Sequence, residues 1–154
     1  MGDVLTKERL VSRVTADFFL RYAELLGRRF DGSFQRGVIF VAIVQGNISH
    51  IGHLSEESLK YADIDTTPPD NLRRPIPVNA VAASLNMPYE TVRRHINALI
   101  ESGYCQKVRG KGIIVPSHVL EAPENRAALK NSYDQMRRMV LLLRRAGVTF
   151  EDDK

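Results

Sequence analysis

Four basic side chains in the middle of the chain have the types and the spacing that bind a phosphate backbone. Arg93 and Arg94 are adjacent in "MPYETVRRHINALIESG", and Arg109 and Lys111 stand in "RGKG" further along the chain. Arginine can pair bidentately with guanine in the major groove of B-DNA, and arginine and lysine both bind phosphate. The chemistry that these residues suggest is therefore recognition of a polyanion, with a solvated charged surface as the alternative.

The distribution of charge agrees with a polyanion partner. The 154 residues carry a net charge of +4, and their 44% apolar and 26% charged residues are typical of a globular chain. Residues 73–120 hold seven arginines and lysines against two acids, a net +5, so the remaining residues sum to −1. A basic segment within a near-neutral scaffold is the pattern expected of a nucleic-acid-binding protein.

Two short helices joined by a tight turn are predicted to position the adjacent arginines. Asn79 can cap a helix over residues 80–85, and "NMP" predicts the turn. Pro88 can open the second helix, because a residue in the first turn needs no N–H donor. Gly103 can adopt the left-handed conformation that ends this helix.

The second helix has one apolar and one polar face. At about 100° per residue, Val92, Ile96 and Leu99 fall in one sector, so we expect them to be buried. Glu90, Arg94, Asn97 and Glu101 lie on the opposite, polar face. Tyr89 and Arg93 lie at one boundary between the two faces, and Thr91 lies at the other.

A β-hairpin is predicted directly after this helix. "YCQKVR" and "GIIVP" have the composition of short strands, and Gly110, Lys111 and Gly112 supply a permissive turn between them. Residues 76–78 could add an edge strand. We expect the hairpin tip and the first turns of the second helix to face the same duplex.

The rest of the chain is predicted to be mostly helical. Residues 6–29 form an amphipathic helix, and residues 34–51 form a mostly buried helix, with a buried strand as its competitor. Four prolines in residues 54–77 predict a surface connection without regular elements. A last helix begins at Pro123 and ends near Gly147. The expected apolar stripes are Val11, Val14, Phe18, Tyr22 and Leu25 on the first helix, Phe34, Val38, Val41, Val44, Ile48 and Ile51 on the second, and Leu129, Tyr133, Met136, Val140 and Leu143 on the last.

The segment "AVAASLNMPYETVRRHINALIESGY" resembles the recognition motif of GntR-type winged helix-turn-helix regulators. The overall layout is more similar to MarR-type regulators, with two N-terminal helices, a central winged module and a long C-terminal dimer helix. Two features depart from the GntR pattern: the module starts near residue 75, and Pro88 cannot donate a hydrogen bond to phosphate. The resemblance implies that DNA contacts come from Tyr89, Thr91, Arg93 and Arg94 on the helix and from Arg109, Gly110 and Lys111 in the wing.

The predicted fold class is therefore mainly α with a small β-hairpin wing, a winged helix-turn-helix with N- and C-terminal dimerisation helices. We expect a helical scaffold and dimerisation region over residues 1–72, the winged helix-turn-helix module over residues 73–120, and a C-terminal helix and tail over residues 121–154. The stripe on the last helix can cover its own core or a second copy of the chain.

The sequence predicts a cytoplasmic, homodimeric transcription regulator that places residues 89–97, including Asn97, in the major groove of double-stranded DNA. Two-fold symmetry would then require an inverted-repeat operator. A cleft beside the dimer interface leaves room for a small-molecule effector, although no residue identifies one. The alternative is a winged-helix module that binds protein and not DNA. The expected dimerisation residues are Phe18, Tyr22, Leu129, Tyr133, Met136, Val140 and Leu143.

Several of these residues have competing interpretations. Arg93 and Arg94 could pair within the helix with Glu90 or Asn97 instead of binding DNA. Glu90 could accept from cytosine, but an acid at that position more often complements the positive end of a helix. His95 lies beside the buried stripe and is predicted to be an interfacial histidine whose hydrogen bonds are satisfied.

The remaining candidates for chemistry are weaker. His50 and His53 stand three residues apart and could bind a metal, but this spacing alone is common at helix ends. The single cysteine, Cys105, is predicted to be a small buried residue, and one cysteine fits a reducing cytosol. No nucleophile motif or phosphate-binding glycine loop is present, so we expect neither an enzyme nor a cofactor. No segment has the roughly 20 apolar residues that cross a bilayer, and the N-terminus lacks the apolar stretch of a signal peptide.

Overall fold

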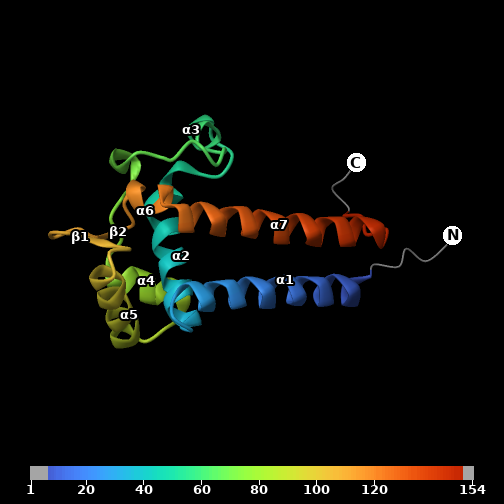
Figure 1. The fold of residues 1–154 in the computed structure, drawn as a ribbon, viewed down its shortest axis with the longest axis horizontal. Coiled ribbons are helices and arrows are strands. Elements are labelled where there is room, and N and C mark those ends of the chain that lie inside the picture. Colours follow the sequence, from blue (N-terminus) through green and yellow to red (C-terminus); the bar gives the residue numbers. More distant parts are fainter. Residues whose placement is uncertain (1–6, 151–154) are drawn as a thin grey trace.

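A computed structural model describes residues 7–150 and shows a mainly helical chain with one two-stranded antiparallel sheet (Figure 1). This agrees with the predicted class of a helical protein with a hairpin. The helices are α1 (Glu8–Arg29), α2 (Phe34–Ile48), α3 (Glu56–Lys60), α4 (Val78–Leu85), α5 (Tyr89–Glu101), α6 (Ser117–Glu121) and α7 (Pro123–Arg145). The strands are β1 (Gln106–Val108) and β2 (Gly112–Ile114), and two 3-10 turns, η1 and η2, span Ser49–Ile51 and Asp70–Leu72.

The two long helices, α1 and α7, run antiparallel and project from the part of the molecule that holds α2 to α6 (Figure 1). We call this pair of helices the arm. They contain 22 and 23 residues, which at about 1.5 Å per residue gives each a length of roughly 33–35 Å. The predicted stripe of α1 is half-buried, and Asp17 on α1 accepts from Arg138 on α7 at 3.4 Å. Pro123 is the first residue of α7 and Gly147 has a positive φ just beyond its end, as predicted.

The central helix, α2, contacts α1, α4, α5 and β2. It is a helix and not a strand, but the predicted buried face was wrong. Ile39, Phe40 and Ile43 are buried, whereas Phe34 is 40% exposed and the rest of the predicted stripe is only partly covered. Because α2 is apolar around most of its circumference and is covered from several sides, its periodicity does not single out one inward face.

A buried asparagine on α2 joins this helix to the hairpin. Asn47 Nδ2 donates to the carbonyl oxygens of Arg74 at 2.8 Å and Ile113 at 3.0 Å, and its Oδ1 accepts from the N–H of Val115 at 2.9 Å. The side chain is fully buried. One amide therefore satisfies backbone groups from two segments that are distant in sequence, and it fixes where the hairpin sits on α2.

Replacing Asn47 with alanine should lower the free energy of unfolding by on the order of 3 kcal/mol, because it leaves buried backbone groups without partners. Urea denaturation measures this loss, and Asn71→Ala at an exposed position is the matched control. Equal midpoints for Asn47→Ala and Asn71→Ala would show that the Asn47 hydrogen bonds do not hold the hairpin in place.

The hairpin pairs Gln106 with Ile114 and Val108 with Gly112. The predicted edge strand at residues 76–78 is reduced to one bridge, in which Ile76 and Ile113 exchange hydrogen bonds of 3.0 and 2.8 Å. It extends no further because the neighbouring prolines of Ile76 have no N–H to donate, and α4 begins at residue 78.

The connection between η1 and α4 lies on the surface, but the expectation that it holds no regular element was wrong. Ser55 Oγ accepts from the N–H of Ser58 at 3.0 Å and begins the short helix α3, whose first turn carries Glu56 and Glu57. A serine cap and acidic residues in the first turn are both common at the start of a helix. Within residues 7–150, no helix is long and apolar enough to span a membrane.

Candidate nucleic-acid interface

The helix pair α4 and α5 is held in place by its apolar faces. Val81 on α4 is buried, and Val92, Ile96 and Leu99 on α5 are buried as predicted. Gly103, with φ of 81°, follows α5 in the left-handed conformation. Two predicted starts were shifted: α4 begins at Val78 with Asn79 inside the helix, and Pro88 is the residue before α5. Pro77 and Pro88 both have extended or nearly extended backbones, so each proline marks the helix start from outside the helix.

The polar face of α5 is exposed. Glu90, Arg94, Asn97 and Glu101 are all exposed, and the ring of Tyr89 at the start of the helix is 52% exposed. Thr91 is half-buried. Because the opposite face is used for packing against the core, the side chains that remain free are the ones that the sequence suggested for DNA contact.

The two adjacent arginines differ in their surroundings. Arg93 Nε donates to Glu90 Oε2 at 3.0 Å, which is the intrahelical pairing considered above as the alternative to DNA contact. This hydrogen bond from Arg93 holds the pKa of Glu90 below its usual value, and Glu90 in turn raises the pKa of Arg93. Arg94 forms no salt bridge with any residue in the described range 7–150. Arg94 is therefore the arginine that is immediately available to a ligand.

The hairpin tip is the second basic site. Arg109, Gly110 and Lys111 are exposed, and the N–H of Lys111 donates to the carbonyl of Val108 at 2.9 Å to close the turn. Gly110 has φ of 73°, a left-handed conformation that favours glycine. The tip and α5 lie at the same end of the molecule, opposite the free ends of the arm helices (Figure 1).

Comparison with protein-family models, with curated proteins and with solved structures finds no match for this chain. Its function must therefore be inferred from the geometry and charge of the described residues.

Arg36 on α2 is a further basic residue beside this surface, and no pattern in the sequence pointed to it. His95 Nε2 lies 3.3 Å from Gln35 Oε1, and burial together with the charges of Arg36 and Arg94 lowers the pKa of His95. His95 is thus an interfacial residue between α5 and α2, as predicted, but its buried Nδ1 has no hydrogen-bond partner among the described residues, so the expectation that both ring nitrogens are satisfied was wrong. Arg36 lies about 60 positions from α5 in sequence, so no local pattern could have placed it there.

The predicted dimerisation residues fall into two groups. Phe18 and Tyr22 stack at 6.1 Å between their ring centroids and are half-buried on the side of α1 that faces α7. Leu143 is also half-buried. By contrast, Tyr133 is 68% exposed, and Leu129, Met136 and Val140 are between 41% and 50% exposed. Phe19 and Leu20 on α1, which lie outside the predicted stripe, are also exposed apolar residues. An apolar surface of the arm therefore remains uncovered in a single chain.

The histidine pair and the cysteine that the sequence singled out are both within the described residues. His50 and His53 are exposed, and no group of three or more metal-ligating side chains occurs within residues 7–150. Cys105 is 2% exposed, which confirms the expectation of a buried cysteine, and burial raises the pKa of its thiol to about 12.

We expect Cys105 to be inert in the folded protein. At pH 8 its reaction with a disulfide reagent should be roughly a thousandfold slower than in the chain unfolded by urea, because the thiolate is the reactive form and burial raises the thiol pKa to about 12. Absorbance of the released thiol follows the reaction. Comparable rates in the folded and the unfolded protein would mean that the thiol is accessible.

Proposed function

We propose that this chain is a homodimeric, sequence-specific DNA-binding transcription regulator of the winged helix-turn-helix class. The observation that carries the proposal is the shared exposure of the polar face of α5 and the basic hairpin tip at one end of the molecule. Both project from a packed core, so both can approach a duplex without rearrangement.

In this proposal α5 enters the major groove and the hairpin lies on the flanking backbone. Arg94 and Asn97 reach base edges, where arginine prefers guanine and asparagine prefers adenine. Arg109 and Lys111 contact phosphates, which fixes the orientation of the helix in the groove. The net charge of +5 in residues 73–120 supplies the attraction that does not depend on base sequence.

The exposed apolar surface of the arm supports a dimer. Monomeric proteins rarely leave a continuous apolar stripe of this kind in water, and Leu129, Tyr133, Met136 and Val140 recur along one side of α7. Two arms packed around a two-fold axis would form a four-helix bundle that covers the stripe. The symmetry would present two α5 helices to half-sites about 34–36 Å apart on an inverted repeat.

Fluorescence anisotropy of a labelled duplex tests the proposal. We expect the dissociation constant to rise with salt concentration. A plot of log Kd against log salt concentration should have a slope of about 4 or more, because two protomers each neutralise several phosphates. Binding that does not change with salt, or no binding to duplex at low salt, would contradict the proposal and favour the protein-interaction module.

A further inference from the structure

An acidic side chain lies in the middle of the surface that we assign to DNA. Glu90 is in the first turn of α5, on the same exposed face as Arg94 and Asn97. Its side chain is 63% exposed. A carboxylate that faces a duplex is repelled by the phosphates, so it weakens any complex in which no base donates a hydrogen bond to it.

The carboxylate of Glu90 is occupied by Arg93 in the free protein. Arg93 Nε donates to Glu90 Oε2 at 3.0 Å, and Arg93 Nη2 donates to Oε1 of the same carboxylate. Hydrogen bonding to Arg93 lowers the pKa of Glu90, so the carboxylate is charged at neutral pH. Because Arg93 is 44% exposed and Glu90 is more exposed still, water screens the pair and a ligand can separate it at a small cost.

The helix α5 carries no net charge. Residues 89–101 contain two arginines and two glutamates, which sum to zero. The net charge of +5 in residues 73–120 therefore comes from bases outside α5, which are Arg73, Arg74, Lys107, Arg109 and Lys111. The helix that we place in the groove gains no net attraction from phosphates, so its contribution depends on the hydrogen bonds that the bases offer.

We propose that Glu90 determines the sequence specificity of the DNA-binding surface, because its carboxylate is accommodated only where a cytosine lies beside it in the major groove. Cytosine presents its N4 amino group there as a donor, and a carboxylate can accept from it. Guanine and thymine present acceptors, and adenine presents the acceptor N7 beside its amino group. At a cytosine, Glu90 accepts from the base and Arg93 is released to bind a phosphate. At the other bases Glu90 keeps Arg93, and neither contact forms. This role of Glu90 rests on the proposed function.

Glu90 also has a structural role, which leads to a different expectation. An acid in the first turn stabilises a helix by interacting with its positive end. If this were the only role of Glu90, its replacement by glutamine would lower the melting temperature and leave the choice of DNA sequence unchanged. The selectivity of binding, and not the stability of the fold, therefore distinguishes the two roles.

Glu90→Gln tests the proposal in the full chain, by fluorescence anisotropy of two labelled duplexes of equal length at one salt concentration. One duplex carries the site selected by the parent protein, and the other has a random sequence. The measured quantity is the dissociation constant for the random duplex divided by that for the selected site. We expect this ratio to fall about tenfold or more, because the variant loses the cytosine contact and is repelled less by random duplex. A ratio equal to that of the parent would overturn the proposal.

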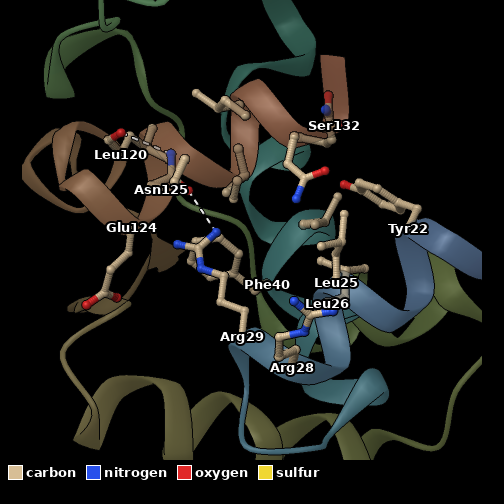
Figure 2. Close-up of a pocket in the computed structure, with 17 residues that line it drawn as sticks. Tyr22, Leu25, Leu26, Arg28, Arg29, Phe40, Leu120, Glu124, Asn125 and Ser132 are labelled. Carbon is tan, nitrogen blue, oxygen red and sulfur yellow. Dashed lines mark hydrogen bonds between the residues drawn. The ribbon is translucent and has the colours of Figure 1, made fainter. Parts of the chain in front are cut away.

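Two matched controls each remove one acid elsewhere. Glu101 is exposed at the last residue of α5. Glu124 is exposed in the first turn of α7, where it lines a cavity of about 390 Å³ between α1, α2 and α7 (Figure 2). Glu101→Gln and Glu124→Gln raise the net charge as much as Glu90→Gln does, so they should tighten binding to both duplexes alike and leave the ratio unchanged. If either lowers the ratio as much as Glu90→Gln, the position of Glu90 does not set the specificity.

A double-mutant cycle tests whether Glu90 withholds Arg93 from random duplex. Arg93→Ala should weaken binding to random duplex more in the Glu90→Gln background than in the parent, because Arg93 is paired in the parent and free in the variant. Additive effects of Glu90→Gln and Arg93→Ala would contradict the proposal.

Failure of the role of Glu90 and failure of the proposed function give different results. A parent protein that binds neither duplex would refute the proposed function, and the role of Glu90 with it. A parent protein that prefers its selected site, together with an unchanged ratio in Glu90→Gln, would refute the role of Glu90 alone.

Discussion

Replacing Arg94 with alanine should reduce the affinity for the preferred DNA site by about 1–3 kcal/mol and relax the preference at one base pair, if arginine pairs bidentately with guanine there. Arg94 lies on the exposed polar face of α5 and has no salt bridge within the described chain. Arg93→Ala should cost less than Arg94→Ala, because Arg93 must first leave Glu90. Anisotropy titrations with operator variants that differ at single positions measure both effects.

Lys111→Ala should behave differently from Arg94→Ala. A lysine at the hairpin tip that contacts phosphate contributes equally to all sequences, so its loss should weaken binding uniformly and reduce the salt slope by about 1 for each bound tip. Arg144→Ala is the matched control, because Arg144 is an exposed base in the last turn of α7. That end of α7 lies away from α5 and the hairpin (Figure 1). If Arg94→Ala and Lys111→Ala both bind like Arg144→Ala, the wrong surface has been assigned to DNA.

Met136→Glu should convert the proposed dimer to a monomer. Met136 lies in the exposed stripe of α7, and two-fold symmetry brings the substitution into the interface twice. At roughly 2 kcal/mol for each buried interface residue lost, the dissociation constant of the dimer should rise by about a thousandfold. Sedimentation equilibrium measures this change. Operator affinity should fall as well, because the two half-sites are no longer bound by one molecule.

Lys130→Glu provides the control for Met136→Glu. Lys130 is exposed on the same helix, about 100° around it from Leu129, and lies outside the stripe. It should leave the dimer intact. A parent protein that sediments as a monomer at micromolar concentration would refute the dimer, and equal behaviour of Met136→Glu and Lys130→Glu would place the interface elsewhere.

The elements with one clear apolar face could be predicted from the sequence, and those without one could not. On α5 the residues Val92, Ile96 and Leu99 are separated by three or four positions and the opposite face is polar, so helix and orientation were both correct. On α2 nearly every turn is apolar, and only tertiary contacts decide that Ile39 and Ile43 face the core and Phe34 does not. The helix was predicted correctly, but its orientation was not.

The same distinction holds for the candidate sites. Arg94 and Lys111 could be selected because they lie in a local pattern of helix, turn and hairpin. Arg36 could not, since it lies on α2, about 60 positions away in sequence from the helix that it stands beside. The sequence could not decide whether Arg93 pairs with Glu90 or binds DNA, because residues three positions apart on a helix can do either. The structure shows the pairing with Glu90.

The proposed arrangement places α5 and the hairpin tips of two protomers against one duplex. Repeated selection of bound fragments from a library of random-sequence duplexes tests this arrangement. The selected sites show which bases the protein recognises and whether its binding site is two-fold symmetric. We expect enrichment of an inverted repeat whose half-sites are about one helical turn apart, roughly 10–10.5 base pairs, with one position losing its preference in the Arg94→Ala variant. A selected pool that remains as random as the starting library would contradict it.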